Sequence, residues 1–283
     1  MTSRDLDAPL LTTSRRFSPR LPRLGLVPAW LVLIVVLAWA VGPTLFTGQS
    51  ATTGLPGAQL QAPGLDHPLG TDELGRDLLA RIIHGARHTL AGATVAVGVG
   101  LLAGSLIGLV AGAVGGRTDA IVMRAVDVLL AIPALLLSLS LIIILGFGPI
   151  QVALAVGVTS VATFARLIRS EVLTVRQADY VEAAFGSGGT FARVLWRHVL
   201  PNSVTSVLAF AAIQSGWAIL QISTLGFLGY GAPPPTPEWG LMIAEGRNYM
   251  TTSWWLTLFP GLAVIAVVLA VNAVGRSMLR ADA

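Results

Sequence analysis

The chain has 283 residues, of which 54% are hydrophobic and only 11% are charged, and its formal net charge is +4. Soluble domains carry about 25% charged residues, so this chain lacks the polar groups to cover a globular surface, which argues against a soluble enzyme and predicts a lipid environment. The 18 basic residues are all arginines that mainly flank apolar segments, which indicates membrane orientation rather than binding to nucleic acid.

Six apolar segments are long enough to cross a bilayer, which takes about 20 helical residues. They predict an all-α, polytopic membrane protein with six transmembrane helices. The predicted spans are Leu26–Phe46, Leu90–Val114, Ile121–Leu145, Ile150–Ile168, Ser203–Leu228 and Trp254–Val274.

The arginines are unevenly divided between the two sides that alternating spans would define. With residues 1–25 as a cytoplasmic tail, fourteen arginines lie inside and four lie outside. The positive-inside rule therefore predicts that both termini are cytoplasmic. The first span, residues 26–46, is predicted to be a retained anchor, because its apolar core exceeds the roughly 7–15 residues of a signal peptide.

Residues 47–88 are predicted to form an external loop followed by an amphipathic helix. From Thr71 onward, apolar residues recur at helical spacing on one face, which is typical of a helix at the membrane surface. The charged residues of this stretch form two i,i+4 pairs with the acid first, Asp72 with Arg76 and Asp77 with Arg81.

Three histidines flank or lie within this helix. His67, His84 and His88 are separated by 17 and 4 positions. This spacing favours solvated histidines near the membrane interface over a metal site, so no metal is expected. The chain also has no cysteine, which excludes disulfides and thiol catalysis.

The second span carries small residues at every fourth position. A face without side chains allows another helix backbone to approach closely, as in G-x-x-x-G pairing. We therefore predict that this face packs against another helix, chiefly through Gly100, Gly104, Gly108 and Gly112. The full series is Gly92, Ala96, Gly100, Gly104, Gly108, Gly112 and Gly116.

The sequence offers little for catalysis. It contains no lysine and therefore no phosphate-binding P-loop, and the chain is expected to be no enzyme and to need no cofactor. Asp127 lies one helical turn after Arg124, and a local i,i+3 ion pair at the interface is the expected explanation. A proton-coupled secondary transporter would show more carboxylates within its spans. Gln214 is a candidate for lining a transport pathway.

The segment at about 170–201, between the fourth and fifth spans, is predicted to form a helical elbow in the cytoplasm. Asp179 is placed to begin a short helix, and Ser187-Gly188-Gly189 is expected to break it. Thr190 is predicted to cap a second helix that continues to Val199 and ends at Pro201. A single structured elbow on a minimal cytoplasmic face indicates a docking site.

The elbow resembles the EAA loop of ABC importer permeases through Glu182-Ala183-Ala184, Gly188 and His198 followed by Leu200-Pro201. Other segments narrow the resemblance to the C-type subunit of dipeptide, oligopeptide and nickel permeases, from about residue 25 to the end of the chain. They are His67–Asp72, Leu74–Asp77, Gly85–Arg87, Met123–Asp127 with Pro133, Phe227–Gly231, Pro234–Gly240, Pro260-Gly261 and Asn272. Arg276 departs from the family pattern, where an acidic residue is common.

This resemblance implies the fold of a type I ABC importer permease, with a five-helix core over residues 89–283. It also implies a bacterial inner-membrane complex with a B-type permease subunit, two ATPase subunits and a peptide-binding protein. Nickel or another small solute, a proton-coupled transporter, and a membrane scaffold or intramembrane enzyme remain as alternatives. The ATPase-coupling residues that the resemblance implies are Tyr180, Glu182, Ala183, Ala184, Gly188, His198 and Pro201.

Overall fold

The computed structural model describes residues 26–194, 197 and 200–281. Within these residues the regular elements are helices, and the only strand-like pairing is an isolated bridge between Thr71 and Asp77. The helices are α1 (Val27–Val41), α2 (Leu78–Val114), α3 (Gly116–Ala131), α4 (Ala134–Leu145), α5 (Pro149–Arg176), α6 (Asp179–Gly186), α7 (Phe191–Val194), α8 (Leu200–Phe227), α9 (Trp239–Gly246) and α10 (Trp255–Ala281).

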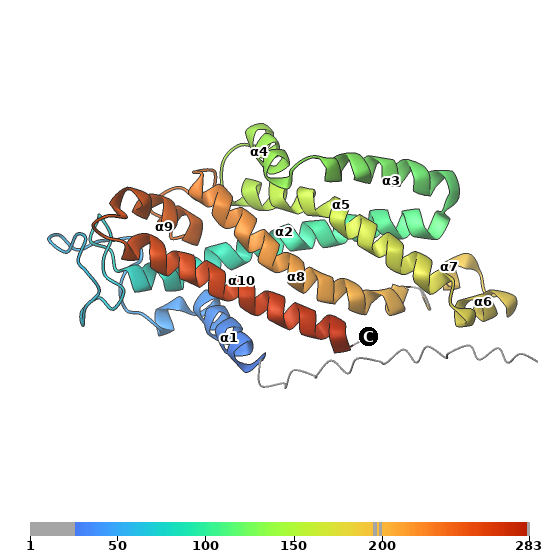
Figure 1. Cartoon of the computed structure of the whole chain (residues 1–283), viewed down its shortest axis with the longest axis horizontal. Coiled ribbons are helices and arrows are strands. Elements are labelled where there is room, and N and C mark those ends of the chain that lie inside the picture. Colours follow the sequence, from blue (N-terminus) through green and yellow to red (C-terminus); the bar gives the residue numbers. More distant parts are fainter. Residues whose placement is uncertain (1–25, 195–196, 198–199, 282–283) are drawn as a thin grey trace, which may run out of the picture.

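The long helices form an elongated bundle (Figure 1). Helix α2 packs along α5, and α8 packs against both of them and against α10. Helices α3 and α4 lie along one side of α5, whereas α1 lies against α2 and α10 on the other side of the bundle. One end of the bundle carries residues 47–77 and α9, and the opposite end carries α6 and α7 (Figure 1).

Four helical stretches within the described residues are long and apolar enough to span a membrane. They are α2, α5, Ser206–Phe227 of α8 and Trp255–Leu279 of α10, and the pair α3–α4 makes a fifth if it counts as one span. The first predicted span contains α1, which is apolar but has only 15 residues. The prediction of an all-α polytopic membrane protein is confirmed.

The third predicted span, Ile121–Leu145, is not one continuous helix. Helices α3 and α4 meet at 94°, and the break lies at Ile132 and Pro133. Pro133 has no backbone N–H to continue the helical hydrogen bonds, and it forces the preceding residue out of helical geometry. Ile132 is accordingly extended, with φ −85° and ψ 129°. The prediction of a single helix is wrong here.

The helix predicted from Thr71 begins later, at Leu78, and continues without interruption into the second span. Asp77 caps it, because its side chain accepts a hydrogen bond from the Ala80 N–H at 2.7 Å. The preceding residues form a turn in which the Asp72 carboxylate accepts hydrogen bonds from the N–H groups of Leu74 and Arg76, both at 2.9 Å. Such local bonds compete with a helical start, so the predicted amphipathic helix is wrong in its first residues, 71–77.

Four glycines of α2, at positions 100, 104, 108 and 112, face α5 with almost no space between the two helices. A Cβ at Gly104 would lie 2.5 Å from the Phe164 Cβ, and one at Gly112 would lie 2.9 Å from the Val172 Cγ1. Gly100 meets Ser160, and Gly108 meets Ala165. The contacts on α5 advance in step with the glycines on α2, so the two helices run parallel. Gly116 lies outside this contact, at the start of α3.

Candidate functional site

The end of the bundle beyond α5 is formed by the two short helices α6 and α7 (Figure 1). Helix α6 ends in a turn in which the Gly189 N–H donates to the Ala184 carbonyl oxygen at 3.1 Å. Gly188 has φ +85°, a left-handed conformation that favours glycine because it has no Cβ. A Cβ at Gly189 would lie only 2.6 Å from the Ala184 carbonyl oxygen. The Ser187-Gly188-Gly189 sequence therefore sets this turn.

The elbow, defined here as residues 179–194, is anchored to the bundle by two apolar side chains. Val181 of α6 and Val194 of α7 are 0% and 1% exposed. Both belong to one buried cluster with residues of α2, α5 and α8, which are Ala113, Ile168, Val172 and Val207. Through this cluster the elbow packs against all three long helices.

Arg176 adds a polar connection between α5 and α2 beside the elbow. Its Nη1 donates to the carbonyl oxygens of Gly112 at 2.7 Å and Ala113 at 2.8 Å. These carbonyls belong to the last turn of α2, where helical N–H partners are missing and a cation is favourable. The arginine therefore ties the end of the glycine face to the start of the elbow.

The ATPase-coupling residues that the family resemblance implies lie mostly at the surface of this elbow. Tyr180 is 46% exposed, Ala183 and Gly188 are exposed, and Ala184 is half-buried. Glu182 lies within α6, whereas His198 lies outside the described residues. Pro201 is the second residue of α8. The predicted continuation of the second helix to Val199 falls on residues 195, 196, 198 and 199, which lie outside the described residues, so its end at Pro201 stays a prediction.

Gln214, the predicted pathway residue, is half-buried in α8. It lies fourteen residues after Leu200, which corresponds to about 21 Å along the helix. The structure therefore does not bring it near the elbow.

The ion pair expected between Arg124 and Asp127 is replaced by a contact between two helices. The Nη2 of Arg166, on α5, donates to the Asp127 carboxylate on α3 at 2.6 Å. Arg169 of α5 likewise pairs with Asp119 of α3. Sequence spacing reveals only neighbours on the same helix. Because α3 lies along α5, Asp127 pairs with Arg166 of α5 rather than with Arg124 of its own helix.

At the opposite end of the bundle, four charged residues form a buried cluster. Arg76 and Arg81 are both 1% exposed, and each contacts Asp72 at 2.6 Å. Glu245, on α9, lies 2.8 Å from Arg81 and 3.5 Å from Arg76. The cluster fastens the turn before α2 to α9, and its charges balance. Glu245 was not identified from the sequence because 164 positions separate it from Arg81.

The predicted pair Asp72–Arg76 is confirmed, and the predicted pair Asp77–Arg81 is wrong. Asp77 instead caps α2 and lies 2.8 Å from the His67 Nδ1. The side chain of His67 is only 11% exposed, so the expected solvated histidine is wrong at this position.

Helix α9 is seated against α2 by two further buried residues. Glu238 caps α9, accepting hydrogen bonds from the N–H groups of Gly240 and Leu241, both at 2.9 Å. Its burial raises the pKa of the carboxyl group above the ordinary value. Trp239 is fully buried, and its indole N–H donates to the Ile82 carbonyl oxygen at 3.0 Å.

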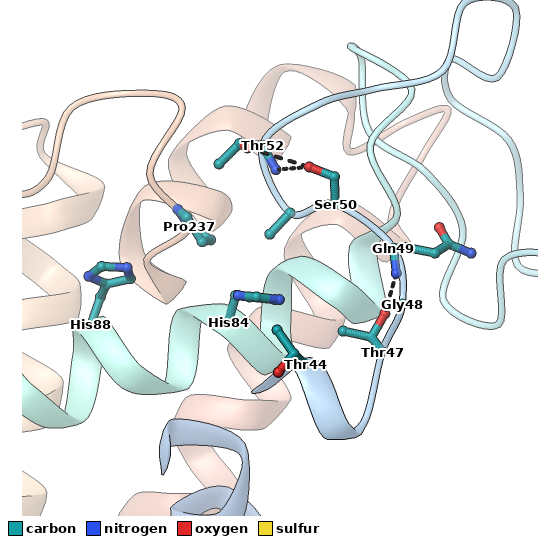
Figure 2. Close-up of a pocket in the computed structure, with 10 residues that line it drawn as sticks. Thr44, Thr47, Gly48, Gln49, Ser50, Thr52, His84, His88 and Pro237 are labelled. Atoms are coloured by element: carbon teal, nitrogen blue, oxygen red, sulfur yellow. Dashed lines mark hydrogen bonds between the residues drawn. The ribbon is translucent and has the colours of Figure 1, made fainter. Parts of the chain in front are cut away.

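Figure 2 shows a pocket of about 540 Å³ between α2 and the loop that follows α1. His84 and His88 lie on its wall, and their rings point toward different parts of it. The described residues contain no group of three histidine, aspartate or glutamate side chains arranged to hold a metal. Most of the remaining lining residues lie in the segment after α1 and are polar or glycine: Thr44, Thr47, Gly48, Gln49, Ser50 and Thr52.

Comparison with known sequences identifies related membrane proteins. Residues 104–281 match the family described as binding-protein-dependent transport system inner membrane component. A putative peptide transport system permease protein from Brucella suis is 40% identical over 96% of this chain and 90% of its own length. A dipeptide permease from Alkalihalophilus pseudofirmus is 36% identical, covering 90% and 84%. A di/tripeptide permease from Pseudomonas aeruginosa is 43% identical, covering 74% and 69%.

Comparison with solved structures identifies membrane proteins whose helices are arranged as in this chain. A chain from an inward-facing structure of the MetNI methionine ABC transporter superposes with a TM-score of 0.60. The match covers 72% of this chain and 96% of that one, at 17% sequence identity. A second crystal form of that transporter gives a TM-score of 0.58 at 19% identity. The chain therefore has the fold of an ABC importer permease.

Proposed function

Because the chain belongs to the family of binding-protein-dependent transport system inner membrane components, we propose that it is the C-type permease subunit of an ATP-driven peptide importer. The observation that carries this proposal is the 40% identity to a putative peptide permease over 96% of the chain. Relatives named for dipeptides and for di/tripeptides support short peptides as the substrate class.

The energy for transport enters from partner subunits. The chain has no lysine, so it has no P-loop to bind the phosphates of ATP. Two ATPase subunits bind on the cytoplasmic side, where the elbow provides this chain's docking surface, and a B-type permease subunit completes the pore. A binding protein delivers peptide from outside. The anchoring of Val181 and Val194 in the cluster shared with α2, α5 and α8 supports the elbow as the point where ATPase movement is transmitted.

The orientation follows from this role and from the arginine distribution. The elbow and both termini face the cytoplasm, and the charged cluster with α9 faces outward. In this orientation the binding protein delivers its peptide at the outer face of the bacterial inner membrane. The fourteen arginines counted on the inner side support this orientation, twelve in the predicted cytoplasmic segments and two, Arg124 and Arg166, near the inner ends of predicted spans.

Uptake by the reconstituted complex tests the proposal. Liposomes containing both permeases, with the ATPases and ATP inside, receive binding protein and radiolabelled dipeptide outside. We expect uptake that requires ATP and this chain. Uptake of nickel with no uptake of dipeptide would reject peptide as the substrate. Uptake that continues without ATP but follows a proton gradient would reject the importer class.

A further inference from the structure

One face of α5 carries polar residues along the half that leads to the elbow. Thr159 and Thr163 are half-buried, and the three residues that follow on the same face are exposed. The spacings of four, three, four and four positions place all five on one side of the helix. The stripe consists of Thr159, Thr163, Arg166, Ser170 and Thr174.

The end of this stripe that lies farthest from the elbow borders a pocket of about 290 Å³ at the break between α3 and α4. Thr159 and Thr163 line one side, and residues 129–134 line the other. A chain that leaves helical geometry within a bilayer has backbone polar groups that lipid cannot satisfy. Broken helices are tolerated where they face protein or a water-filled cavity. The break at Pro133 therefore argues that this face is turned away from lipid.

The ion pair between Arg166 and Asp127 lies nearer the elbow than the pocket does. It independently indicates that this face is turned away from lipid. The side chains of Arg166 and Asp127 are 57% and 53% exposed in the single chain. Both residues lie near the inner ends of the predicted spans Ile121–Leu145 and Ile150–Ile168, where a charged pair faces water or protein rather than lipid. Thr159 lies ten residues after Pro149, about 15 Å along α5, which is half of a hydrocarbon core of about 30 Å. The stripe thus runs from mid-membrane toward the elbow.

We propose that this pocket and stripe form a peptide-contacting site on the transport route, an inference that rests on the proposed function. The Thr159 hydroxyl donates to the Val156 carbonyl oxygen at 2.7 Å, so its oxygen accepts from a peptide N–H. The Thr163 hydroxyl also contacts the peptide main chain, which is common to peptides of any sequence. Arg166 receives the C-terminal carboxylate, because its planar guanidinium matches a carboxylate with two parallel hydrogen bonds. Asp127 balances the charge of Arg166, which keeps the site neutral overall for a zwitterionic peptide.

Cysteine accessibility tests the location of the site. The chain has no cysteine, so Thr163→Cys introduces one thiol that mass spectrometry can follow in the reconstituted complex. The probe is a charged, membrane-impermeant methanethiosulfonate. The control is Leu106→Cys, an apolar position on α2 that is 64% exposed. We expect the cysteine at 163 to react at least tenfold faster than the control, and dipeptide-loaded binding protein with ATP to slow the reaction. Equal slow reaction at both positions, or no effect of dipeptide, would overturn the site.

Substitution of Arg166 tests its role. Arg166→Gln should lower dipeptide uptake at least tenfold, while the yield of assembled complex and the ATPase stimulation by loaded binding protein stay normal. Arg166→Lys should recover part of the uptake, because it restores the positive charge without the planar geometry. Arg117→Gln, which removes an exposed arginine of α3, is the control and should transport normally. Normal uptake by Arg166→Gln rejects this inference alone, whereas a wild-type complex that imports no dipeptide rejects the proposed function.

Discussion

Arg176, at the end of α5, and Gly112, in the last turn of α2, join these two helices beside the elbow. The Arg176 Nη1 donates to the Gly112 carbonyl oxygen at 2.7 Å, and Gly112 itself packs against Val172 of α5. Arg176 is the last residue of α5, three positions before α6 begins. A displacement of the elbow therefore reaches the end of α2 through both a charged hydrogen bond and a close backbone contact.

Removal of this connection should separate ATP hydrolysis from transport. Arg176→Gln loses charge-assisted hydrogen bonds that each contribute about 1.5–3 kcal/mol. We expect a several-fold fall in dipeptide imported per ATP hydrolysed, with the complex still assembled. Arg117→Gln removes a charge from an exposed position of α3 and should leave the ratio unchanged. A normal ratio in Arg176→Gln would show that the bond has no part in coupling.

The glycine face of α2 should tolerate no large side chain. Gly104→Leu forces a side chain into a space where even a Cβ would meet Phe164 Cβ at 2.5 Å and the Val161 carbonyl oxygen at 2.6 Å. Overpacking typically costs about 1–3 kcal/mol, and a backbone clash costs more. We expect a lower yield of folded subunit and a lower melting temperature in detergent. Leu106→Val, at an exposed position of α2, is the control, and equal stability of the two variants would contradict the packing.

Glu73 should make stability depend on pH. Burial, and then the nearby Glu245 and Asp72 carboxylates, raise the pKa of Glu73 above its ordinary value of 4.5. The folded chain thus binds a proton that the unfolded chain releases, so stability falls as pH rises from 4.5 toward the raised pKa.

Glu73→Gln should remove this loss of stability at higher pH, because glutamine has no carboxyl group to ionise. We expect its melting temperature to exceed that of the wild type increasingly above pH 4.5. The gain should be below about 1 kcal/mol, since the group is only partly buried. Asp66→Asn, at an exposed position of the same loop, should follow the wild type. Parallel melting curves for Glu73→Gln and wild type across the pH range would contradict the assignment.

The proposed orientation predicts which introduced cysteines react on intact spheroplasts. Leu65 is fully exposed in the loop before α2, and Leu65→Cys should react with an impermeant thiol reagent. Ala283→Cys should react only after lysis. The absence of native cysteine makes the readout specific. Reaction at position 283 without lysis would reverse the topology.

Elements that depend on local chemistry were predictable from the sequence. Most of the apolar spans, the glycine face and the turn at Gly188 follow from composition, spacing and the special geometry of glycine, whereas the broken third span does not. The pair Asp72–Arg76 was found because its members are four positions apart.

Features that depend on tertiary packing could not be predicted from the sequence. Arg166 is 39 positions from Asp127, and Glu245 is 164 positions from Arg81, so periodicity reveals neither pair. The sequence alone does not decide the effect of Pro133, because a proline within an apolar run is compatible with a kinked or a broken helix. The 94° bend depends on how α3 and α4 pack against α5.

Coupling through the elbow is the central claim of this account, and Gly188 tests it most directly. Gly188→Val places a branched side chain at φ +85°, where the surrounding space is open but the backbone is strained. Gly186→Ala is the matched control, because it also faces open space and has no positive φ.

The decisive measurement is simultaneous dipeptide uptake and ATP hydrolysis by the complete complex in liposomes. We predict that Gly188→Val inserts and assembles, imports at less than about a tenth of the wild-type rate, and loses the stimulation of hydrolysis by loaded binding protein. Glu182→Lys should behave alike, and Gly186→Ala should remain close to wild type. Uptake and stimulation at wild-type levels in Gly188→Val and Glu182→Lys would contradict the account.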